Sequence, residues 1–496
     1  MNSSAFDSSI DSESAPTAMT RSGLVRGEYD GEVCAFRGIP YAKPPFGDRR
    51  FSPPERPDAW KDIRNATEFG PAAPQPTSDG TLELLPAPKV WGEDCLTVNV
   101  WSPKAATDAP VMVFLHGGAF VTGGGSVATY DGAAFARDGV VLVTLNYRLG
   151  VEGFLYTGEG HANLGILDQI AALEWVRDNI SNFGGDAGNV TLFGESAGAM
   201  SACTLMTIPR ASSLFHRVIA ESGAGQIALP KADALRVSDR LAEILGVPAS
   251  RAALKDLPIE TVLAAQAQLE KEVSSDLRVR KWGQLARTLM PFEPVIDGDL
   301  ITELPQNVLA RGEGADVDLM IGTNSEETNL FFVPGDVKLP YPIAHVLAHR
   351  YGGRLFGLVR SYHARGKRGA SEIARAVLAD AVYRVPALQI ARAHPRSHVY
   401  QFTWRSPAFN GQLGACHALE LPFVFDTLDK PGLEVLLGDA PPQDLASEMH
   451  SAWVRFAKTG NPGWADFTRL RPNTRFFGNR SRTGIDDTVN TTVWRS

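Results

Sequence analysis

Short, almost wholly apolar runs recur along the chain, separated by segments with helical periodicity. The runs 111–115 (VMVFL) and 140–145 (VVLVTL) are rich in β-branched residues, as expected of strands buried on both faces of a parallel sheet. Further strands are expected at 190–193, 218–220, 319–322 and 398–404. Segment 164–180 carries apolar residues at helical spacing and predicts an amphipathic helix. This alternation predicts an α/β fold with a mostly parallel central sheet.

Two long stretches interrupt the alternation and define the expected domain organisation. Residues 232–284 and 333–395 have mostly helical patterns. Insertions of this kind lie above the carboxyl ends of the strands, so we expect both to roof a pocket, with plain helical packing as the alternative. Residues 1–18 are rich in Ser and acidic residues, and we expect a disordered tail there. The catalytic domain is therefore expected to span 19–496.

Composition and charge exclude several classes of function. The 496 residues carry a formal charge of −8 with no Lys/Arg run, so no nucleic-acid partner is expected. No stretch is apolar enough for a membrane span, and the start of the chain lacks the basic and apolar regions of a signal peptide. The four cysteines form no C-x-x-C pair. We expect a cytoplasmic protein with reduced thiols, either a monomer or a small homo-oligomer.

The segment Gly194-Glu195-Ser196-Ala197-Gly198 has the G-x-S-x-G spacing of a nucleophilic serine. This spacing serves a sharp strand-to-helix turn, at which small flanking residues avoid clashes. The spacing alone is weak, and a surface turn flanked by glycines is the alternative. Here an apolar strand (VTLF) leads into the motif and a helix-compatible segment follows it. The context therefore favours Ser196 as a nucleophile.

Two further segments supply the remaining chemistry of an acyl transfer. His116-Gly117-Gly118-Ala119-Phe120 follows the strand 111–115, and backbone N–H groups of such a loop can converge on a carbonyl oxygen. We expect an oxyanion hole made by Gly118 and Ala119 together with Ala197, the residue after the nucleophile. A base must lie downstream, and His417 follows the strand 398–404 in a polar loop. Glu326 and Glu327 both follow the strand 319–322, and their position alone does not separate them as the acid.

Several motifs in order resemble the type-B carboxylesterase family, which includes bacterial para-nitrobenzyl esterase-like enzymes and the cholinesterases. They are GIPYAKPP, EDCLTVNVW, HGGAF, NYRLG, NLGILDQIAALEWV, FGGD, VTLFGESAGA and WVRFAKTGNP, and they span nearly the whole chain after the first twenty residues. The resemblance implies an α/β-hydrolase fold and hydrolysis of small-molecule carboxylic esters, with short or medium acyl or aryl groups, without a metal or organic cofactor.

The resemblance also assigns residues. It implies that His417 is the triad base and maps the triad acid to Glu327, although Thr328 stands where the family has Gly. It implies that Ser222 hydrogen-bonds that glutamate. It likens the loop 289–298 to the segment that lines the acyl pocket, which gives Leu289, Met290 and Phe292 as pocket residues. Phe331 is a further pocket residue, and Leu330, Phe332 and Tyr383 are additional candidates, with core packing as the alternative for each.

The chain departs from the family pattern at a tryptophan and at a cysteine, and other functions are possible on the same fold. Trp91 does not match the placement of the choline-binding Trp of cholinesterases, so a choline site is not expected. Cys95 lacks the nearby upstream cysteine with which it pairs in secreted relatives. The main alternative is an aryl carbamate or amide hydrolase that uses the same triad. A non-catalytic binding protein on an esterase fold and an interfacial lipase are weaker alternatives.

Overall fold

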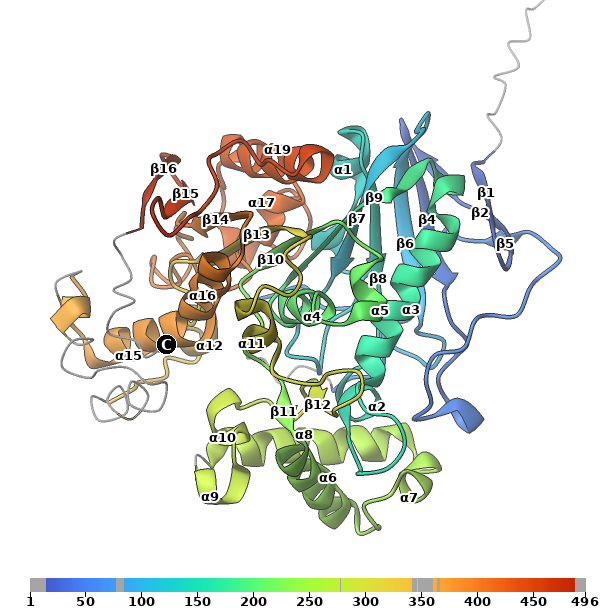
Figure 1. The fold of residues 1–496 in the computed structure, drawn as a ribbon, viewed down its shortest axis with the longest axis horizontal. Helices are drawn as coiled ribbons and strands as arrows, with labels where there is room; N and C mark the ends of the chain where they lie inside the picture. Colours follow the sequence, from blue (N-terminus) through green and yellow to red (C-terminus); the bar gives the residue numbers. More distant parts are fainter. Residues whose placement is uncertain are drawn as a thin grey trace, which may run out of the picture.

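The computed structural model describes residues 15–76, 84–276, 278–340, 346, 360–363 and 366–486. An eleven-stranded sheet forms its centre (Figure 1). The strands, in spatial order, are β16 (Arg482–Ile485), β15 (Asn473–Phe477), β14 (Ser397–Phe402), β13 (Asp318–Asn324), β10 (Arg217–Glu221), β9 (Gly185–Glu195), β7 (Ala109–Leu115), β8 (Val141–Leu145), β6 (Thr97–Pro103), β4 (Val33–Pro40) and β3 (Glu28–Asp30). The strands from β15 to β8 are parallel, and the edges are antiparallel. The mostly parallel sheet expected from the sequence is confirmed.

Successive side chains of the central strands pack alternately into two separate hydrophobic cores, one on each face of the sheet. On β7, Val111, Val113 and Leu115 join one core, whereas Met112 and Phe114 join the other. Successive side chains of a strand point to opposite faces, so each run of apolar residues must be covered on both sides. The run 111–115 is therefore apolar at every position because helices cover both faces of the sheet.

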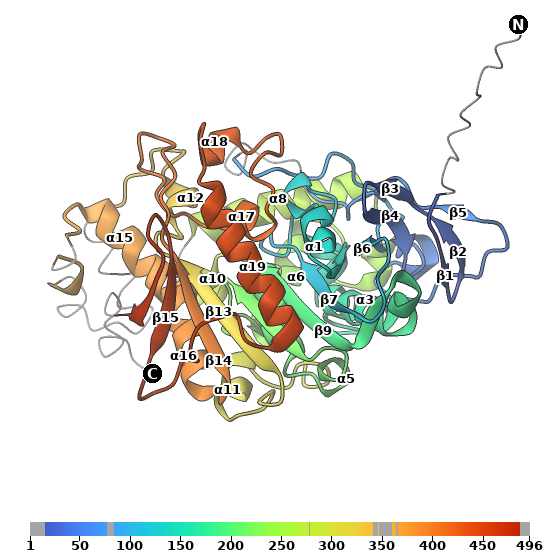
Figure 2. The same ribbon diagram turned by 90° about the horizontal axis from the view of Figure 1, so that it is seen from above.

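Helices cover each face. One face carries α3 (Leu164–Asn179), α4 (Ala197–Leu205), α11 (Pro305–Ala310) and α16 (Val385–Ala393). The other carries α1 (Ala133–Arg137), α17 (Leu421–Val424) and α19 (Gln443–Thr459), and Figure 2 shows α1 and α19 in front of the sheet. Shorter helices are α2 (Gly150–Phe154), α5 (Pro209–Ser212), α12 (Asn329–Phe332) and α18 (Glu434–Leu437).

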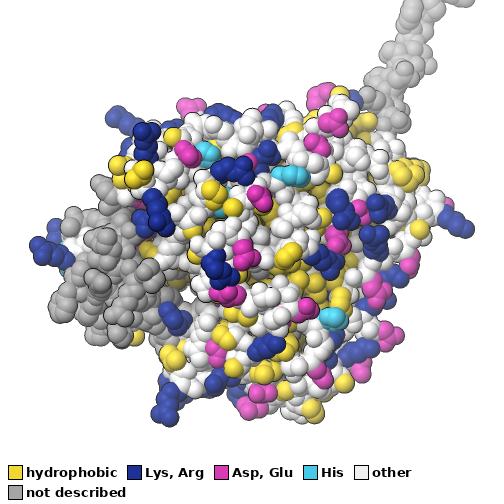
Figure 3. All heavy atoms as spheres, viewed as in Figure 1, with side chains coloured by type: hydrophobic (Ala, Val, Ile, Leu, Met, Phe, Trp, Pro, Cys, Tyr) yellow, Lys and Arg dark blue, Asp and Glu magenta, His cyan; other side chains and the backbone are white. Residues whose placement is uncertain are grey.

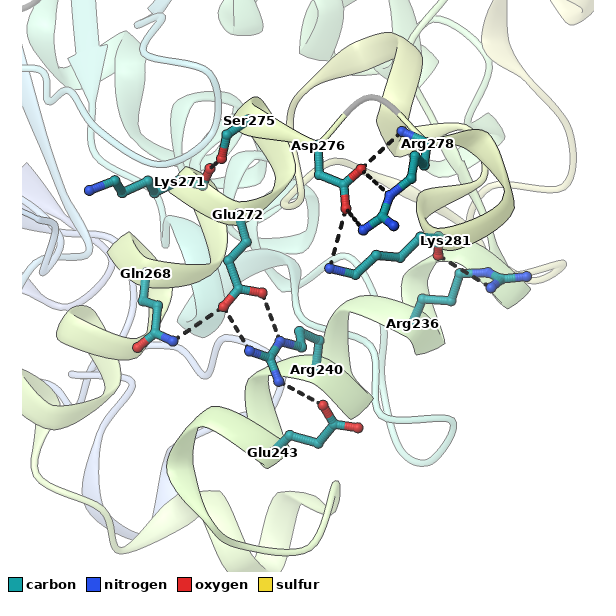
Figure 4. Close-up of polar contacts among 10 residues, drawn as sticks. All are labelled: Arg236, Arg240, Glu243, Gln268, Lys271, Glu272, Ser275, Asp276, Arg278 and Lys281. Carbon is teal, nitrogen blue, oxygen red and sulfur yellow. Dashed lines mark hydrogen bonds and ion pairs between the residues drawn. The ribbon is translucent and has the colours of Figure 1, made fainter.

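The first expected insertion is helical. It contains α6 (Lys231–Leu245), α7 (Arg251–Lys255), α8 (Ile259–Ser275) and α9 (Val279–Trp282), followed by α10 (Leu285–Thr288). These helices form a layer at one end of the molecule, next to the short pair β11 (Leu229–Pro230) and β12 (Val295–Ile296) (Figure 1). Figure 4 shows the charged contacts that join them: Arg240 on α6 donates to Glu272 on α8 at 2.7 and 2.8 Å.

The second expected insertion is described in part. Residues 341–345, 347–359 and 364–365 lie outside the described residues. The described part includes α15 (Ala370–Ala379), a π-helical turn (Asp380–Arg384) and α16. Three contacts hold this turn in place. Tyr362 donates to Asp380 at 2.5 Å, Gln226 donates to the carbonyl of Val382 at 2.7 Å, and Arg384 donates to Gln401 at 3.0 Å.

The N-terminal region packs beside the sheet. Residues 1–14 of the expected tail lie outside the described residues, and β1 (Thr17–Thr20) begins within the remaining part of it. The strand β1 pairs with β2 (Gly23–Arg26), which pairs with β5 (Arg64–Asn65). All four cysteines are buried, and none of them is in a disulfide bond. No helix among the described residues is long and apolar enough to cross a membrane.

Candidate active site

Ser196 lies at a tight turn between β9 and α4. Its φ of 55° and ψ of −120° are unusual for a residue with a side chain, and such strain concentrates at functional sites. Its backbone N–H donates to the carbonyl of Glu221 at 2.9 Å. A Cβ at Gly198 would lie 1.9 Å from the carbonyl oxygen of Leu115, so no larger residue fits there. This is the strand-turn-helix context that the G-x-S-x-G spacing predicts.

The His-Gly-Gly loop lies directly against this turn. A Cβ at Gly117 would lie 3.1 Å from Cβ of Ser196. Gly118 and Ala119 both have positive φ, 110° and 53°, which folds the loop back on itself. No described residue accepts a hydrogen bond from the N–H of Gly118 or of Ala119. Ala197 is the first residue of α4, so its N–H has no acceptor within the helix.

His417 and Glu327 are joined by a short hydrogen bond. Nδ1 of His417 lies 2.7 Å from Oε2 of Glu327, and the backbone N–H of His417 donates to the carbonyl of Glu327 at 3.1 Å. The other carboxylate oxygen accepts from Ser222 Oγ and from the N–H of Asn324, both at 2.7 Å. Glu327 is wholly buried and His417 nearly so. The carboxylate is therefore held by two donors while it orients the imidazole ring.

Glu326, the alternative acid, points to a different part of the molecule. Its carboxylate pairs with Arg405, lies 3.4 Å from Nζ of Lys367 and accepts from the N–H of Ala415 at 3.1 Å. Its backbone N–H donates to the carbonyl of Ala415 at 2.9 Å. Glu326 therefore fastens the loop that precedes His417, and Glu327 is the glutamate that contacts the imidazole.

Three more buried carboxyl groups form a cluster with the imidazole: Glu195 and Glu420 act on it directly, and Glu221 acts on those two. Oε1 of Glu195 lies 3.0 Å from Nε2 of His417. Glu420 accepts from Asn324, and Ser222 Oγ lies 3.5 Å from it. Glu221 accepts from Trp453 Nε1 at 2.9 Å. All three are at most 3% exposed, so His417 lies in a largely water-free acidic cluster.

Burial and mutual repulsion govern protonation in this cluster. Burial raises the pKa of Glu195, Glu221 and Glu420, because each ionised form loses its hydration, and neighbouring carboxylates raise the pKa of each further. Burial on its own lowers the pKa of His417, but Glu195 and Glu327 outweigh it, so the pKa of His417 is raised. The imidazole therefore binds a proton more readily than an isolated histidine.

Aromatic rings pack against the imidazole ring. The ring centroids of Tyr383 and Phe331 lie 4.8 and 5.5 Å from that of His417. Tyr383 reaches it from the π-helical turn, a feature that often occurs at functional sites. Of the other expected pocket residues, Phe292 is buried in the core, Met290 is partly buried against it, and Leu289 is 42% exposed.

Sequence reasoning missed most of the acidic cluster. In the sequence, Glu195 is only the variable residue of the G-x-S-x-G motif, and no motif quoted above includes Glu420. A signal was present for Glu195, because a residue next to the nucleophile in a buried turn must also be buried. Glu221 carried no such signal. Among the described residues, no group of three or more His, Cys, Asp or Glu is arranged to hold a metal ion.

Comparisons with known proteins agree with this geometry. The model of the carboxylesterase family matches residues 14–340. The chain is 40% identical to para-nitrobenzyl esterase of Bacillus subtilis (strain 168) over 461 residues, covering 89% of this chain and 90% of the relative. It is 34% identical to phenmedipham hydrolase of Pseudarthrobacter oxydans, covering 90% of each, and 33% identical to carboxylesterase 1E of Rattus norvegicus, covering 92% and 88%.

Solved structures match over almost the entire chain. Carboxylesterase EST55 of Geobacillus stearothermophilus superposes with a TM-score of 0.84 at 36% identity, covering 97% of this chain and 100% of that one. A PNB esterase structure superposes with a TM-score of 0.85 at 35% identity and the same coverage. The chain therefore belongs to the carboxylesterase family, and it is a carboxylic ester hydrolase with the α/β-hydrolase fold.

Proposed function

We propose that the chain hydrolyses carboxylic esters through an acyl-enzyme formed on Ser196, with His417 as the base and Glu327 as the acid of the triad. The observation that carries the proposal is the 2.7 Å contact between Nδ1 of His417 and the doubly anchored carboxylate of Glu327. This contact fixes the tautomer that leaves Nε2 available as an acceptor. The imidazole also lies 3.0 Å from Glu195, which immediately precedes a serine at a strained strand-to-helix turn.

Acylation begins when Nε2 of His417 takes the hydroxyl proton of Ser196 as the oxygen attacks the ester carbonyl. Glu327 stabilises the imidazolium that forms, and Ser222 holds Glu327 in position. The N–H groups of Gly118, Ala119 and Ala197 stabilise the oxyanion. Donors of this kind contribute about 3 kcal/mol each to the transition state. Collapse of the tetrahedral intermediate releases the alcohol, which takes its proton from His417.

Deacylation repeats the same steps with water. His417 takes a proton from the water as its oxygen attacks the acyl-enzyme, and the acid leaves while Ser196 recovers its proton. Every step uses proton transfer and backbone hydrogen bonds, so the mechanism needs no metal or organic cofactor. The partner is the small-molecule ester itself, and on the face in Figure 3 positive and negative side chains are interspersed, as suits a protein without a nucleic-acid partner.

The substrates proposed are esters with short or medium acyl chains or aryl groups. Leu289, Met290, Phe292 and Phe331 are the proposed pocket residues, and the contact of Phe331 with the imidazole supports its part in this set. Cleavage of aryl carbamates or amides is the second candidate, because it uses the same machinery. One relative is named phenmedipham hydrolase, which makes phenmedipham a substrate to assay. Values of kcat/KM for a p-nitrophenyl acyl series, aryl carbamates and phenmedipham decide between the two.

The cellular location and the oligomeric state of the enzyme are also proposed. Four buried cysteines without a disulfide bond suit a reducing compartment, which supports a cytoplasmic location. Cell fractionation tests this, and recovery in an exported fraction contradicts it. A monomer or small homo-oligomer is proposed, and light scattering measures its mass.

A pair of serine variants tests the proposed nucleophile kinetically. Ser196→Ala is expected to lower kcat for p-nitrophenyl acetate by at least about 10³-fold, because the acyl-enzyme cannot form. Ser212→Ala removes a half-buried serine of α5, outside the proposed triad, and should leave kcat unchanged. If Ser196→Ala retains wild-type kcat while folded, the proposed nucleophile is wrong.

A further inference from the structure

A cavity of about 230 Å³ lies apart from the triad, between the N-terminal strands and α3. Its walls come from Arg21 and Ser22 after β1, from the loop 53–57 and from the outer face of α3. None of Ser196, Glu327 and His417 lines it. An empty cavity of about 150 Å³ suffices for benzene, so this one has room for an aromatic ring with a small polar group.

The floor of the cavity is apolar and regular. Leu167, Ala171 and Trp175 line it from α3 at four-residue spacing, so they lie on one face of the helix. Prolines 53, 54 and 57 line it from the loop. These surfaces offer van der Waals contact to a flat or apolar body, and the indole N–H of Trp175 is a hydrogen-bond donor among them.

Two neutral side chains of the lining, Tyr41 and Asn179, are already bonded. The hydroxyl of Tyr41 donates to the carbonyl of Asn146 at 2.7 Å. The side chain of Asn179 accepts from the N–H of Arg21 and donates to the carbonyl of Trp175, both at 2.7 Å. An ionised ligand group is bound most strongly by side chains of opposite charge, so the charged residues of the lining decide which ion fits.

Three guanidinium groups share one carboxylate at this cavity. Arg21, Arg56 and Arg177 lie 3.0, 3.3 and 2.9 Å from oxygens of Asp178. The Asp178 side chain is 8% exposed, whereas those of Arg21 and Arg56 are 61% and 70% exposed. One buried carboxylate neutralises one positive charge, so an excess of two remains here, and Arg21 and Arg56 also line the cavity. An excess of this kind attracts an anion.

The other charges at the cavity reduce this excess from two to one. Arg210 is paired with Glu174 at 3.0 Å. Glu55 is the remaining charged residue of the lining, and it opposes an anion. The ligand class that fits the floor and the excess charge together is a carboxylate with an apolar, preferably aromatic, body.

We propose that this cavity is a second ligand site, which binds an organic carboxylate through Arg21 and Arg56 with its apolar body on the Leu167–Trp175 face of α3. Guanidinium groups bind carboxylates through two parallel N–H···O bonds, which a neutral amide cannot replace with equal strength. Carboxylates of this class are also released by ester hydrolysis, so the site would sense a product. The proposal does not depend on which residue is the nucleophile.

Isothermal titration calorimetry with benzoate tests the site, and benzamide serves as the neutral ligand of the same shape. Benzoate is expected to bind saturably at one site and benzamide at least about tenfold more weakly, because a charge-assisted hydrogen bond is lost. Equal affinity for the two ligands, or no binding of benzoate, overturns the proposal.

Variants locate the binding. Arg21→Gln with Arg56→Gln should weaken benzoate binding by about ten- to hundredfold, and Glu55→Gln should strengthen it. Arg311→Gln, an exposed arginine paired with Glu303 away from the cavity, is the matched control and should change nothing. If the double variant does not fold, Arg56→Gln alone carries the test, because that side chain is largely exposed. Unchanged benzoate affinity in the folded arginine variants overturns the proposal.

Discussion

Nε2 of His417 lies 3.0 Å from Oε1 of Glu195, the residue immediately before Ser196. The imidazole nitrogen that must take the proton of the serine therefore has a buried carboxyl group beside it. Both groups have raised pKa values, so they compete for and share protons. His417 can act as a base only when its imidazole is neutral, and the carboxyl group delays that state to higher pH.

Replacement of this carboxyl group should move the pH profile. Glu195 raises the pKa of His417, so Glu195→Gln lowers it, and the neutral imidazole appears at lower pH. The acidic limb of kcat/KM should shift down by about one pH unit. The pKa of His417 is raised to about 9, so activity on a p-nitrophenyl ester is measured from mildly acidic pH to above this value. Glu293→Gln, a buried carboxyl group outside the cluster, is the control, and an equal shift in both variants would contradict this account.

The two neighbouring glutamates should differ sharply on substitution. Glu327→Gln removes the carboxylate at Nδ1 of His417 and should lower kcat on the order of 10³- to 10⁴-fold. Glu326→Gln weakens the contacts with Arg405 and Lys367 and should lower kcat by no more than about tenfold. Steady-state kinetics on one ester compare them, with circular dichroism to check folding. The reverse order of effects would reassign the acid to Glu326.

The π-helical turn should affect catalysis through the packing of Tyr383 against His417. Its ring packs against His417, so Tyr383→Ala leaves the imidazole freer to tilt and should lower kcat by about tenfold with a smaller change in KM. Tyr383→Phe keeps the ring and should restore most of kcat. If the phenylalanine variant is as slow as the alanine variant, ring packing is not the function of Tyr383.

Glu293 should make stability depend on pH. Burial raises its pKa to about 8, and both carboxyl oxygens lack a hydrogen-bond partner among the described residues. The unfolded chain loses this proton near its ordinary pKa of 4.5, whereas the folded chain keeps it to about 8. The free energy of unfolding therefore falls as pH rises from about 4.5 to 8 and levels off above, by a few kcal/mol at most.

Glu293→Gln cannot ionise and should remove this part of the pH dependence. Urea unfolding of the wild type and the variant at pH 5, 7 and 8.5 measures the difference, which should grow with pH in favour of Gln. A difference that is constant across these pH values would show that Glu293 is not buried in its protonated form.

The sequence predicted the features that depend on neighbours along the chain. The turn at Ser196 and the loop at Gly118 are each encoded within about five residues, because glycine positions and an adjoining apolar strand suffice to define them. Glu327 could be preferred over Glu326 only through the family resemblance. Both follow the same strand, and only the packed loop before His417 separates their directions.

Features that join distant segments were not predictable in this way. The acidic cluster combines residues at four different elements: Glu195 and Glu221 end β9 and β10, Glu327 follows β13, and Glu420 precedes α17. Nothing near Glu221 marks it as a neighbour of Glu420. No sequence pattern marks the π-helical turn. Its extra residue per turn is stabilised by contacts with distant segments, such as that of Gln226 with the carbonyl of Val382. The cavity beside α3 likewise requires the N-terminal strands to be in place.

The assignment of Ser196 as the nucleophile is tested most directly by mapping a covalent adduct. The folded protein is treated with a fluorophosphonate and digested, and the modified peptide is sequenced by mass spectrometry. The account predicts one phosphonyl group per chain on Ser196, with none on the Ser196→Ala variant and undiminished modification of Ser212→Ala. An adduct on another residue, or equal modification of Ser196→Ala, would contradict it.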